Sequence, residues 1–254
     1  MAVQISRELK RLVPQLRYEP TAKRLRARLG DELILDSHRA IVVWEPGRHL
    51  PVHAVPEDDV VARLEPAAPG EGRANHTADG ELLTVRAGAH TAAGQAFRLS
   101  DPDLSGYIVL ETDAFDWFEE DELVVGHPRD PFARIDIRAT SRRVRVLLDG
   151  AVLAATTRSV ILFEGQLPPR TYIPREDVNW GLLQPVELVT VCPYKGHAHY
   201  WTAPGLGDGR PVAWSYGPEF PEMAQIHGLV AFFDERTDVE VDGRIPARPA
   251  TAWT

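Results

Sequence analysis

The chain has 254 residues, of which 44% are hydrophobic and 26% charged, and its formal net charge is -9. This composition is typical of a soluble globular protein, and no segment approaches the roughly 18 consecutive apolar residues that a membrane-spanning helix requires. The acidic balance opposes non-specific attraction to nucleic acid. Neither a membrane nor nucleic acid is therefore an expected partner.

The cysteine content and the N-terminal residues bear on the compartment. The single cysteine, Cys192, excludes an internal disulfide and a cysteine-rich zinc site. Residues 1–17 are charged and lack the apolar stretch of a secretory signal. We therefore expect a cytoplasmic protein with no structural metal and no cofactor.

The N-terminal part of the chain predicts a helix followed by a hairpin. The segment Ser6–Val13 carries apolar residues on one side and begins with serine, a good helix cap. Apolar and charged residues alternate over Arg24–Leu29, which predicts a half-buried strand. The following Gly30-Asp31 is typical of a hairpin turn.

The chain resembles itself at a spacing of 119 residues. Residues 33–45 match residues 152–164 in type and order, and this match includes two pairs of identical charged residues. These pairs are Arg39 with Arg158 and Glu45 with Glu164. A spacing of 118 then relates residues 55–60 to 173–178, and a spacing of 115 relates residues 117–120 to 232–235. We interpret the matches as two copies of one domain.

The repeat sets the expected domain boundaries. Residues 1–20 form an N-terminal extension, residues 21–131 a first, degenerate repeat domain, and residues 138–246 a second repeat domain. A copy of about 110 residues is a normal domain size. Short apolar segments separated by turn residues predict strands. In the second repeat these are Val144–Leu148, Val160–Phe163, Val186–Val191, Val212–Tyr216, Leu229–Phe233 and Val239–Val241.

Each copy contains one short helix candidate, Pro56–Leu64 and Pro174–Leu183. In both, proline opens the segment and acidic residues follow, which favours the positive N-terminal end of a helix. The sequence thus predicts a mainly β protein with two tandem antiparallel β domains, each with one short helix.

The second copy resembles the family called domain of unknown function 427, which is also filed as nucleotidyltransferase-like. The residues that carry the resemblance are Arg158, Phe163-Glu164, Tyr172-Ile173-Pro174, Asp177, Cys192-Pro193-Tyr194-Lys195-Gly196, Trp214-Ser215-Tyr216 and Gly228-Leu229-Val230-Ala231-Phe232. The resemblance implies a β-tent-like fold and identifies the chain as a tandem two-domain form of the family. A glycine-rich phosphate loop and a pair of metal-binding carboxylates, which nucleotidyl transfer requires, are not evident.

The segment Cys192–Gly196 distinguishes the two copies. At a spacing of 118 its five residues stand opposite Ala74, Asn75, His76, Thr77 and Ala78. Copy one therefore lacks the thiol, phenol and amine of this segment. We expect the ligand site in copy two for this reason.

Cys192 and Lys195 are the candidate catalytic residues. Cys192 is a nucleophile if a neighbouring cation lowers its pKa, and otherwise an inert thiol at the end of an apolar strand. Lys195 presents an ammonium to an anionic or carbonyl-bearing ligand, or is a solvated turn lysine. His197 and His199 share one strand face and form an alternative metal pair, although no further ligands are evident.

The remaining candidates are expected to bind the ligand. Arg158 and Glu164 lie six residues apart, and we interpret them mainly as an ion pair on one strand face. Aromatic side chains either line a pocket or pack between sheets. These aromatic candidates are Tyr172, Tyr194, Tyr200, Trp214 and Tyr216.

The sequence therefore favours recognition of a small polar or anionic molecule in a pocket of the second domain, with Lys195 and Arg158 supplying charge. An enzyme version of this hypothesis also transforms that molecule. The alternative is a non-catalytic protein-interaction module of two packed β domains, and a homo-oligomer remains open. An exposed apolar face instead of a concave polar pocket would favour the alternative.

Overall fold

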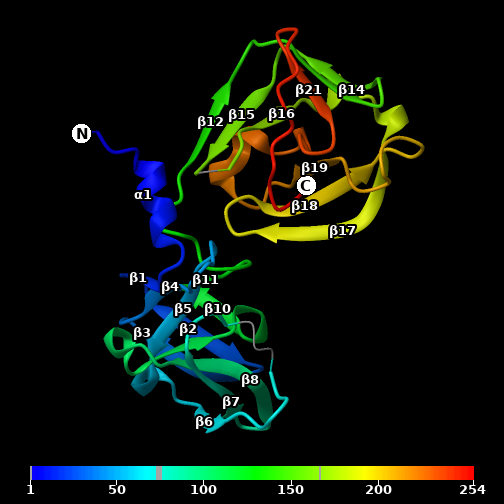
Figure 1. The fold of residues 1–254 in the computed structure, drawn as a ribbon. Helices are drawn as coiled ribbons and strands as arrows, with labels where there is room; N and C mark the ends of the chain where they lie inside the picture. The colour runs from blue at the N-terminus through cyan, green and yellow to red at the C-terminus, as the bar shows by residue number, and fades with distance from the viewer. Residues whose placement is uncertain (1, 73–75, 166) are drawn as a thin grey trace. The chain divides into compact units, whose positions relative to one another are not determined.

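A computed structural model describes residues 2–72, 76–165 and 167–254. The chain divides into two compact units, unit 1 (Met1–Pro131) and unit 2 (Phe132–Thr254). Each unit contains its own antiparallel sheets (Figure 1), so the expected mainly β fold with two groups of antiparallel strands is confirmed. Within the described residues no helix is both long and apolar enough to span a membrane.

Unit 1 begins with the helix α1 (Ile5–Leu12), which has Gln4 rather than Ser6 at its N-cap and buries none of its residues. Its seven-stranded sheet has the order β1-β4-β5-β9-β8-β7-β6, and its four-stranded sheet has the order β11-β10-β2-β3. The first strand lies in the segment expected as an N-terminal extension. The strands are β1 (Arg17–Pro20), β2 (Leu25–Leu29), β3 (Glu32–Ser37), β4 (Ile41–Trp44), β5 (Val52–Pro56), β6 (Arg63–Pro66), β7 (Gly80–Ala87), β8 (His90–Leu99), β9 (Tyr107–Leu110), β10 (Asp116–Glu119) and β11 (Glu122–Leu123).

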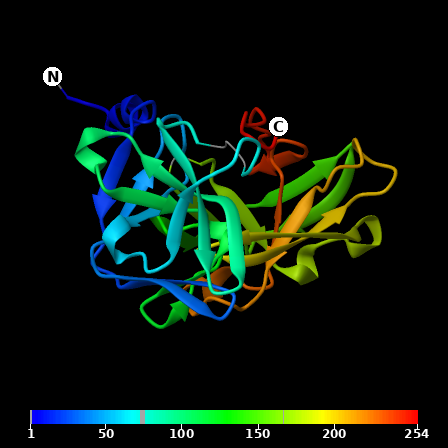
Figure 2. The same cartoon turned by 90° about the horizontal axis from the view of Figure 1, so that it is seen from below.

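Unit 2 contains a seven-stranded sheet of order β12-β15-β16-β20-β19-β18-β17 and a three-stranded sheet of order β14-β13-β21. The strands are β12 (Ile135–Ala139), β13 (Val144–Leu148), β14 (Ala151–Thr156), β15 (Val160–Glu164), β16 (Arg170–Ile173), β17 (Gln184–Cys192), β18 (Gly196–Thr202), β19 (Ala213–Tyr216), β20 (Val230–Phe232) and β21 (Asp238–Val241). The segment after β21 turns back along unit 2 (Figures 1 and 2), where Thr251 donates a hydrogen bond to Glu235 at 2.6 Å.

The two seven-stranded sheets have the same strand order when strands are counted from the start of each unit. The pairing of residues across four neighbouring strands also agrees. In unit 1 one row of paired residues is Val55, Ile108, Arg98 and Glu81. The corresponding row in unit 2 is Ile173, Val230, Ser215 and His199.

This pairing shows that the sequence match of Trp117 with Phe232 is wrong. Trp117 lies on β10 and pairs with Ala27 of β2, whereas its place in unit 2 is taken by Val239, which pairs with Val146. Phe232 lies on β20, the counterpart of β9. A short aromatic-acidic pattern does not fix a register, because strands of different position can share it.

The expected short helices are 3-10 turns. They are η1 (Glu57–Asp59) and η4 (Arg175–Asp177), followed in unit 2 by η5 (Trp180–Leu182). The helical stretch stops early because the next residue, Val60 or Val178, is extended and bridges to β3 or β14.

Each unit buries apolar side chains on both faces of its large sheet. In unit 2, Val146 of β13 and Phe232 of β20 belong to the cluster that includes the small sheet. A second cluster contains Leu162, Tyr172 and Trp214. Because successive strand residues face opposite sides, the aromatic candidates of the sequence fall mainly in this second cluster.

Candidate functional site

Lys195 lies in the turn between β17 and β18, and its side chain is buried. Its ammonium donates to Glu164 at 2.5 Å, and the two side chains are 6% and 21% exposed. The next residue, Gly196, has a φ of 89°, and a Cβ there would meet the Glu219 carboxylate at 2.6 Å. The charge of Lys195 is therefore balanced by Glu164 within the unit.

Arg158 pairs with Asp177 at 2.9 Å, so the expected ion pair between Arg158 and Glu164 is wrong. Arg158 stands in a bend before β15, and the six-residue spacing therefore does not run along one continuous strand. Thr156 also donates to Asp177, at 2.6 Å. The hydrogen bond from Thr156 and then that from Arg158 lower the pKa of Asp177.

Unit 1 contains the same arrangement around Asp59. Ser37 donates to Asp59 at 2.6 Å, and Arg39 pairs with the same carboxylate. The backbone N–H of Arg39 donates to Ser37, as that of Arg158 does to Thr156. In each unit this contact holds the bend that precedes a strand of the large sheet, β4 in unit 1 and β15 in unit 2, and we assign it a structural role.

The aromatic candidates of unit 2 mostly pack on one another. Tyr172 and Trp214 are buried and lie edge to face, with ring centres 6.4 Å apart. Burial raises the pKa of Tyr172 and of Tyr216, so both phenols are neutral at ordinary pH. The hydroxyl of Tyr200 hydrogen-bonds with that of Thr190 at 2.7 Å. Tyr172 and Trp214 thus take the core-packing role.

The remaining sequence candidates are more exposed. Cys192 ends β17 and is partly exposed, and Tyr194 is half-buried in the following turn. His197 and His199 share a face of β18, and His197 lies 3.6 Å from Glu219. In the part of the chain that the structure describes, no group of three or more His, Cys, Asp or Glu side chains could hold a metal ion.

His76 of unit 1 occupies the role of Lys195. Its Nδ1 lies 2.7 Å from Glu45, the counterpart of Glu164, and its Nε2 lies 2.9 Å from Glu111. Burial opposes the charge on His76, but Glu111 and Glu45 outweigh it and raise the pKa of His76 to about 9. The spacing of 118 had placed Thr77 opposite Lys195.

Ala74 and Asn75, which stand opposite Cys192 and Pro193 at the spacing of 118, lie outside the described residues. Thr77 and Ala78 donate backbone N–H groups to Glu45, the latter at 3.0 Å. Unit 1 therefore also has a buried cation-carboxylate pair, with a histidine where unit 2 has a lysine, and the pair by itself does not mark a ligand site.

An open hollow lies over β18 and β19 of unit 2, with a volume of about 400 Å³. We call it the β18–β19 hollow. Its lining residues are Arg175, Pro185, Val186, His199, Tyr200, Trp201, Ser215, Tyr216, Gly217 and Gly228. Two of the aromatic candidates, Tyr200 and Tyr216, thus belong to it, whereas Lys195, Glu164 and Arg158 do not.

The cation of the hollow is held in place by tryptophans. The Arg175 guanidinium lies 4.2 Å from the ring centre of Trp180 and 5.8 Å from that of Trp201. Trp180 also donates its indole N–H to the carbonyl of Arg175 at 2.8 Å. An arginine stacked in this way keeps its in-plane N–H donors available to a ligand.

The same place in unit 1 holds a closed ion cluster. Arg98 donates to Glu57 at 2.6 and 2.8 Å and to Glu81 at 2.6 Å. Glu57 and Arg175 are each the first residue of the 3-10 turn of their unit. In the rows of paired residues, Glu81 corresponds to His199 and Arg98 to Ser215. Unit 2 therefore has an arginine and a histidine at the positions where unit 1 has two carboxylates.

Unit 2 is thus an antiparallel β domain of two sheets with a cationic hollow on its larger sheet. Residues 136–243 match the family model described as "Domain of unknown function (DUF427)", and unit 2 is a domain of that family. No curated protein matches the chain. The resemblance seen in the sequence is confirmed for this unit.

Arg175 was absent from the sequence candidates, although a signal for it was present. It stands opposite Glu57 in the match of residues 55–60 with 173–178, which is a reversal of charge within an otherwise similar segment. His199 and Ser215 carried no comparable signal, because their proximity to Arg175 depends on strand register.

Proposed function

We propose that unit 2 binds a small anionic molecule in the β18–β19 hollow, with Arg175 as the main recognition residue. The observation that carries this proposal is that unit 2 lacks the carboxylates of the ion cluster that unit 1 has at the same place. Where unit 1 neutralises Arg98 with Glu57 and Glu81, unit 2 presents Arg175 and no internal replacement for the two acids among the described lining residues. A ligand carboxylate or phosphate supplies the missing negative charge.

The chemistry of the lining fits such a ligand. His199 is exposed and Ser215 is buried, and both point to the face that carries Trp201. A histidine and a hydroxyl add hydrogen bonds beside the bidentate guanidinium. Trp201 and Pro185, paired across β17 and β18, supply an apolar wall. The hollow therefore favours an anion with a small apolar body.

Benzoate is a suitable probe, because it combines a carboxylate with a planar apolar ring. Its affinity for the full chain is measured by isothermal titration calorimetry for the wild type and for Arg175→Met. Losing a charge-assisted hydrogen bond worth about 1.5 to 3 kcal/mol weakens binding roughly tenfold to a hundredfold. Equal affinity of the two proteins contradicts the proposal.

Arg158→Met is the matched control. Arg158 is also an arginine of unit 2, 63% exposed and paired with Asp177, but it does not line the hollow. It should bind benzoate like the wild type. If Arg158→Met lowered the benzoate affinity more than Arg175→Met, Arg158 would be the arginine that binds the anion, as the sequence analysis expects.

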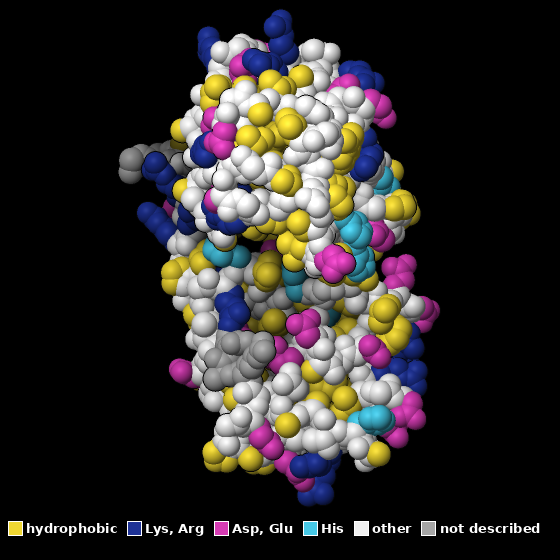
Figure 3. Space-filling model, turned by 90° about the vertical axis from the view of Figure 1, so that its right-hand side faces the viewer, with side chains coloured by type: hydrophobic (Ala, Val, Ile, Leu, Met, Phe, Trp, Pro, Cys, Tyr) yellow, Lys and Arg dark blue, Asp and Glu magenta, His cyan; other side chains and the backbone are white. Residues whose placement is uncertain are grey.

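One observation favours the alternative, an interaction module. β17 is the edge strand of its sheet and exposes Leu188, Val189 and Val191, whereas its counterpart β6 is short. A long apolar edge is a template for pairing with another strand. On the face drawn in Figure 3, however, hydrophobic side chains lie in small groups among polar and charged ones.

Self-association through β17 is tested by light scattering of Val189→Lys. If β17 mediates self-association, the wild type is a dimer and the variant is a monomer. An equal mass of the two proteins would contradict self-association through β17.

We also infer that the two units are copies of one domain. The shared strand order, the matching rows of paired residues and the repeated Asp59 and Asp177 contacts support this inference. In this view the hollow is open in unit 2, whereas in unit 1 the ion cluster of Arg98, Glu57 and Glu81 fills its place. We therefore expect only unit 2 to bind the anion. A benzoate-binding site abolished by Glu57→Gln but not by Arg175→Met would contradict this division.

A further inference from the structure

We propose that unit 2 has a second ligand site, a cavity between its two sheets that binds a small organic amine with an apolar body through Asp234. We call it the edge cavity. It has a volume of about 280 Å³. Its aliphatic lining comes mainly from Val144, Ile161, Val239, Val241 and the prolines at 168, 169, 246 and 249. Because these residues differ from those of the β18–β19 hollow, the proposal is independent of the proposed function.

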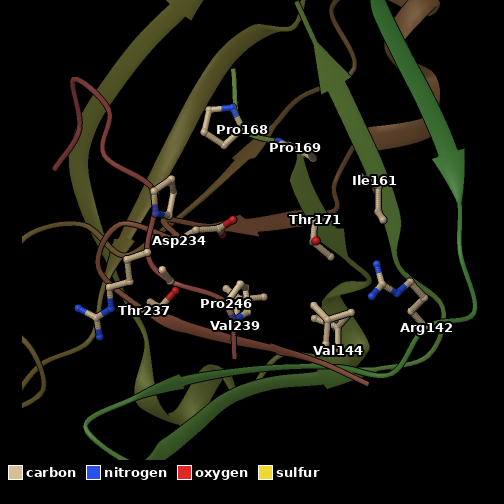
Figure 4. A pocket seen from close by; sticks show the side chains of 14 residues that line it. Arg142, Val144, Ile161, Pro168, Pro169, Thr171, Asp234, Thr237, Val239 and Pro246 are labelled. Carbon is tan, nitrogen blue, oxygen red and sulfur yellow. The ribbon is translucent and has the colours of Figure 1, made fainter. Parts of the chain in front are cut away.

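Asp234 supplies the recognition group. Figure 4 shows its carboxylate and the Thr171 hydroxyl directed into the cavity from opposite sides. The side chain of Asp234 is 25% exposed, and the nearest cation, Arg170, is 3.8 Å away. Arg170 is already bound by both oxygens of Glu235, at 2.6 and 3.0 Å. The charge of Asp234 is thus only partly compensated.

The charges at the rim of the cavity compensate one another. Arg142 donates to Asp242 at 2.8 Å, and Arg248 pairs with Asp238 at 2.9 Å. The groups that face or surround Asp234 therefore sum to one negative charge once Arg170 and Glu235 are counted. A monocation is the complementary ligand, and the aliphatic walls select one with an apolar body.

Unit 1 shows what closes such a cavity. Its residue at the position of Val239 is Trp117, which pairs with Ala27 as Val239 pairs with Val146. His53 of β5 is the counterpart of Thr171 of β16, because each lies two residues before the matching residues Val55 and Ile173. The ring centre of His53 lies 5.0 Å from that of Trp117. The cavity exists in unit 2 because small side chains replace these two rings.

The pKa of Asp234 agrees with an unfilled cation site. Burial raises the pKa of Asp234, Arg170 opposes this in part, and Glu235 adds to it, so that the pKa is about 6. A bound ammonium would restore the ionised form. Benzylamine should therefore bind roughly tenfold more tightly at pH 7 than at pH 5, since the ionised fraction of a group with a pKa of about 6 changes about tenfold between these values.

Benzylamine is the probe, and its binding to the full chain is followed by calorimetry at pH 7. Asp234→Asn should weaken binding at least about tenfold, and Val239→Trp, which introduces the side chain found in unit 1, should abolish it. Asp242→Asn, a rim acid, is the matched control and should change the affinity less than about twofold.

Benzyl alcohol, the neutral analogue, should bind at least about tenfold more weakly than benzylamine. The proposal is overturned if benzylamine does not bind, if benzyl alcohol binds equally well, or if Asp234→Asn retains the wild-type affinity. Should Asp234→Asn fail to fold, the pH dependence of wild-type binding decides: affinity that is equal at pH 5 and pH 7 overturns the proposal.

Discussion

Replacing Lys195 with methionine should destabilise unit 2 strongly, which separates a structural ion pair from a solvated turn lysine. The side chain of Lys195 is 6% exposed, and its ammonium donates to Glu164 at 2.5 Å. Removing one partner of a buried pair costs about 3 to 5 kcal/mol, because the other charge stays buried. Glu164 is 21% exposed, so water partly solvates it in the variant. We therefore expect a loss of about 3 kcal/mol.

The assay is urea unfolding, with the double-mutant cycle of Lys195→Met and Glu164→Gln. For a unit of this size the loss corresponds to a midpoint shift of roughly 1 to 2 M urea. Glu164→Gln also leaves a partner unpaired, and the double variant should recover about 2 kcal/mol relative to the sum of the single variants. Arg158→Met, at an exposed pair, should cost less than about 1 kcal/mol. Additive effects in the cycle, or a larger loss from Arg158→Met, would show that Lys195 and Glu164 do not form a stabilising ion pair.

Three further predictions concern stability and reactivity. The carboxylates of Glu111 and Glu45 raise the pKa of His76 to about 9 in the folded protein, so His76 contributes about 3 kcal/mol of stability below pH 6.5. This contribution is lost as the pH rises through 9, and His76→Gln should abolish the resulting slope of stability in urea unfolding between pH 6.5 and 9.5. Gly196→Ala should cost about 2 kcal/mol in thermal unfolding, because of positive φ and the Glu219 contact, against about 1 kcal/mol for Gly205→Ala, which has open space. Alkylation of Cys192 with iodoacetamide, verified by mass, should leave benzoate affinity within about twofold; loss of binding would favour the nucleophile hypothesis.

The sequence was sufficient to predict the antiparallel class and many of the strands, among them β13, β15, β17, β19, β20 and β21. Alternation in segments such as Val144–Leu148 reflects burial of one face, and this signal survives in the structure. The helix candidates after Pro56 and Pro174 were shorter than expected, since bridges made by Val60 and Val178 are tertiary contacts that local propensity does not contain.

The candidate site was harder to predict because it depends on which side chains pair. The Arg158 and Glu164 spacing looked like one ion pair, but a bend before β15 sends Arg158 to Asp177 and leaves Glu164 to Lys195. Likewise, His76 pairs with Glu45 in unit 1 as Lys195 pairs with Glu164 in unit 2, because either cation can neutralise a buried carboxylate. A comparison of residue types does not reveal this equivalence. The sequence signal for the proposed anion site is instead a charge reversal between aligned segments, from Glu57 to Arg175.

The most direct test of the anion site is a backbone amide NMR titration of the labelled full chain with benzoate. We expect saturable shifts at Trp201, Ser215 and Gly217, which line the β18–β19 hollow, with the same dissociation constant as calorimetry. Saturable shifts centred instead on Cys192 and Lys195, or shifts that do not saturate, would show that the β18–β19 hollow is not an anion site.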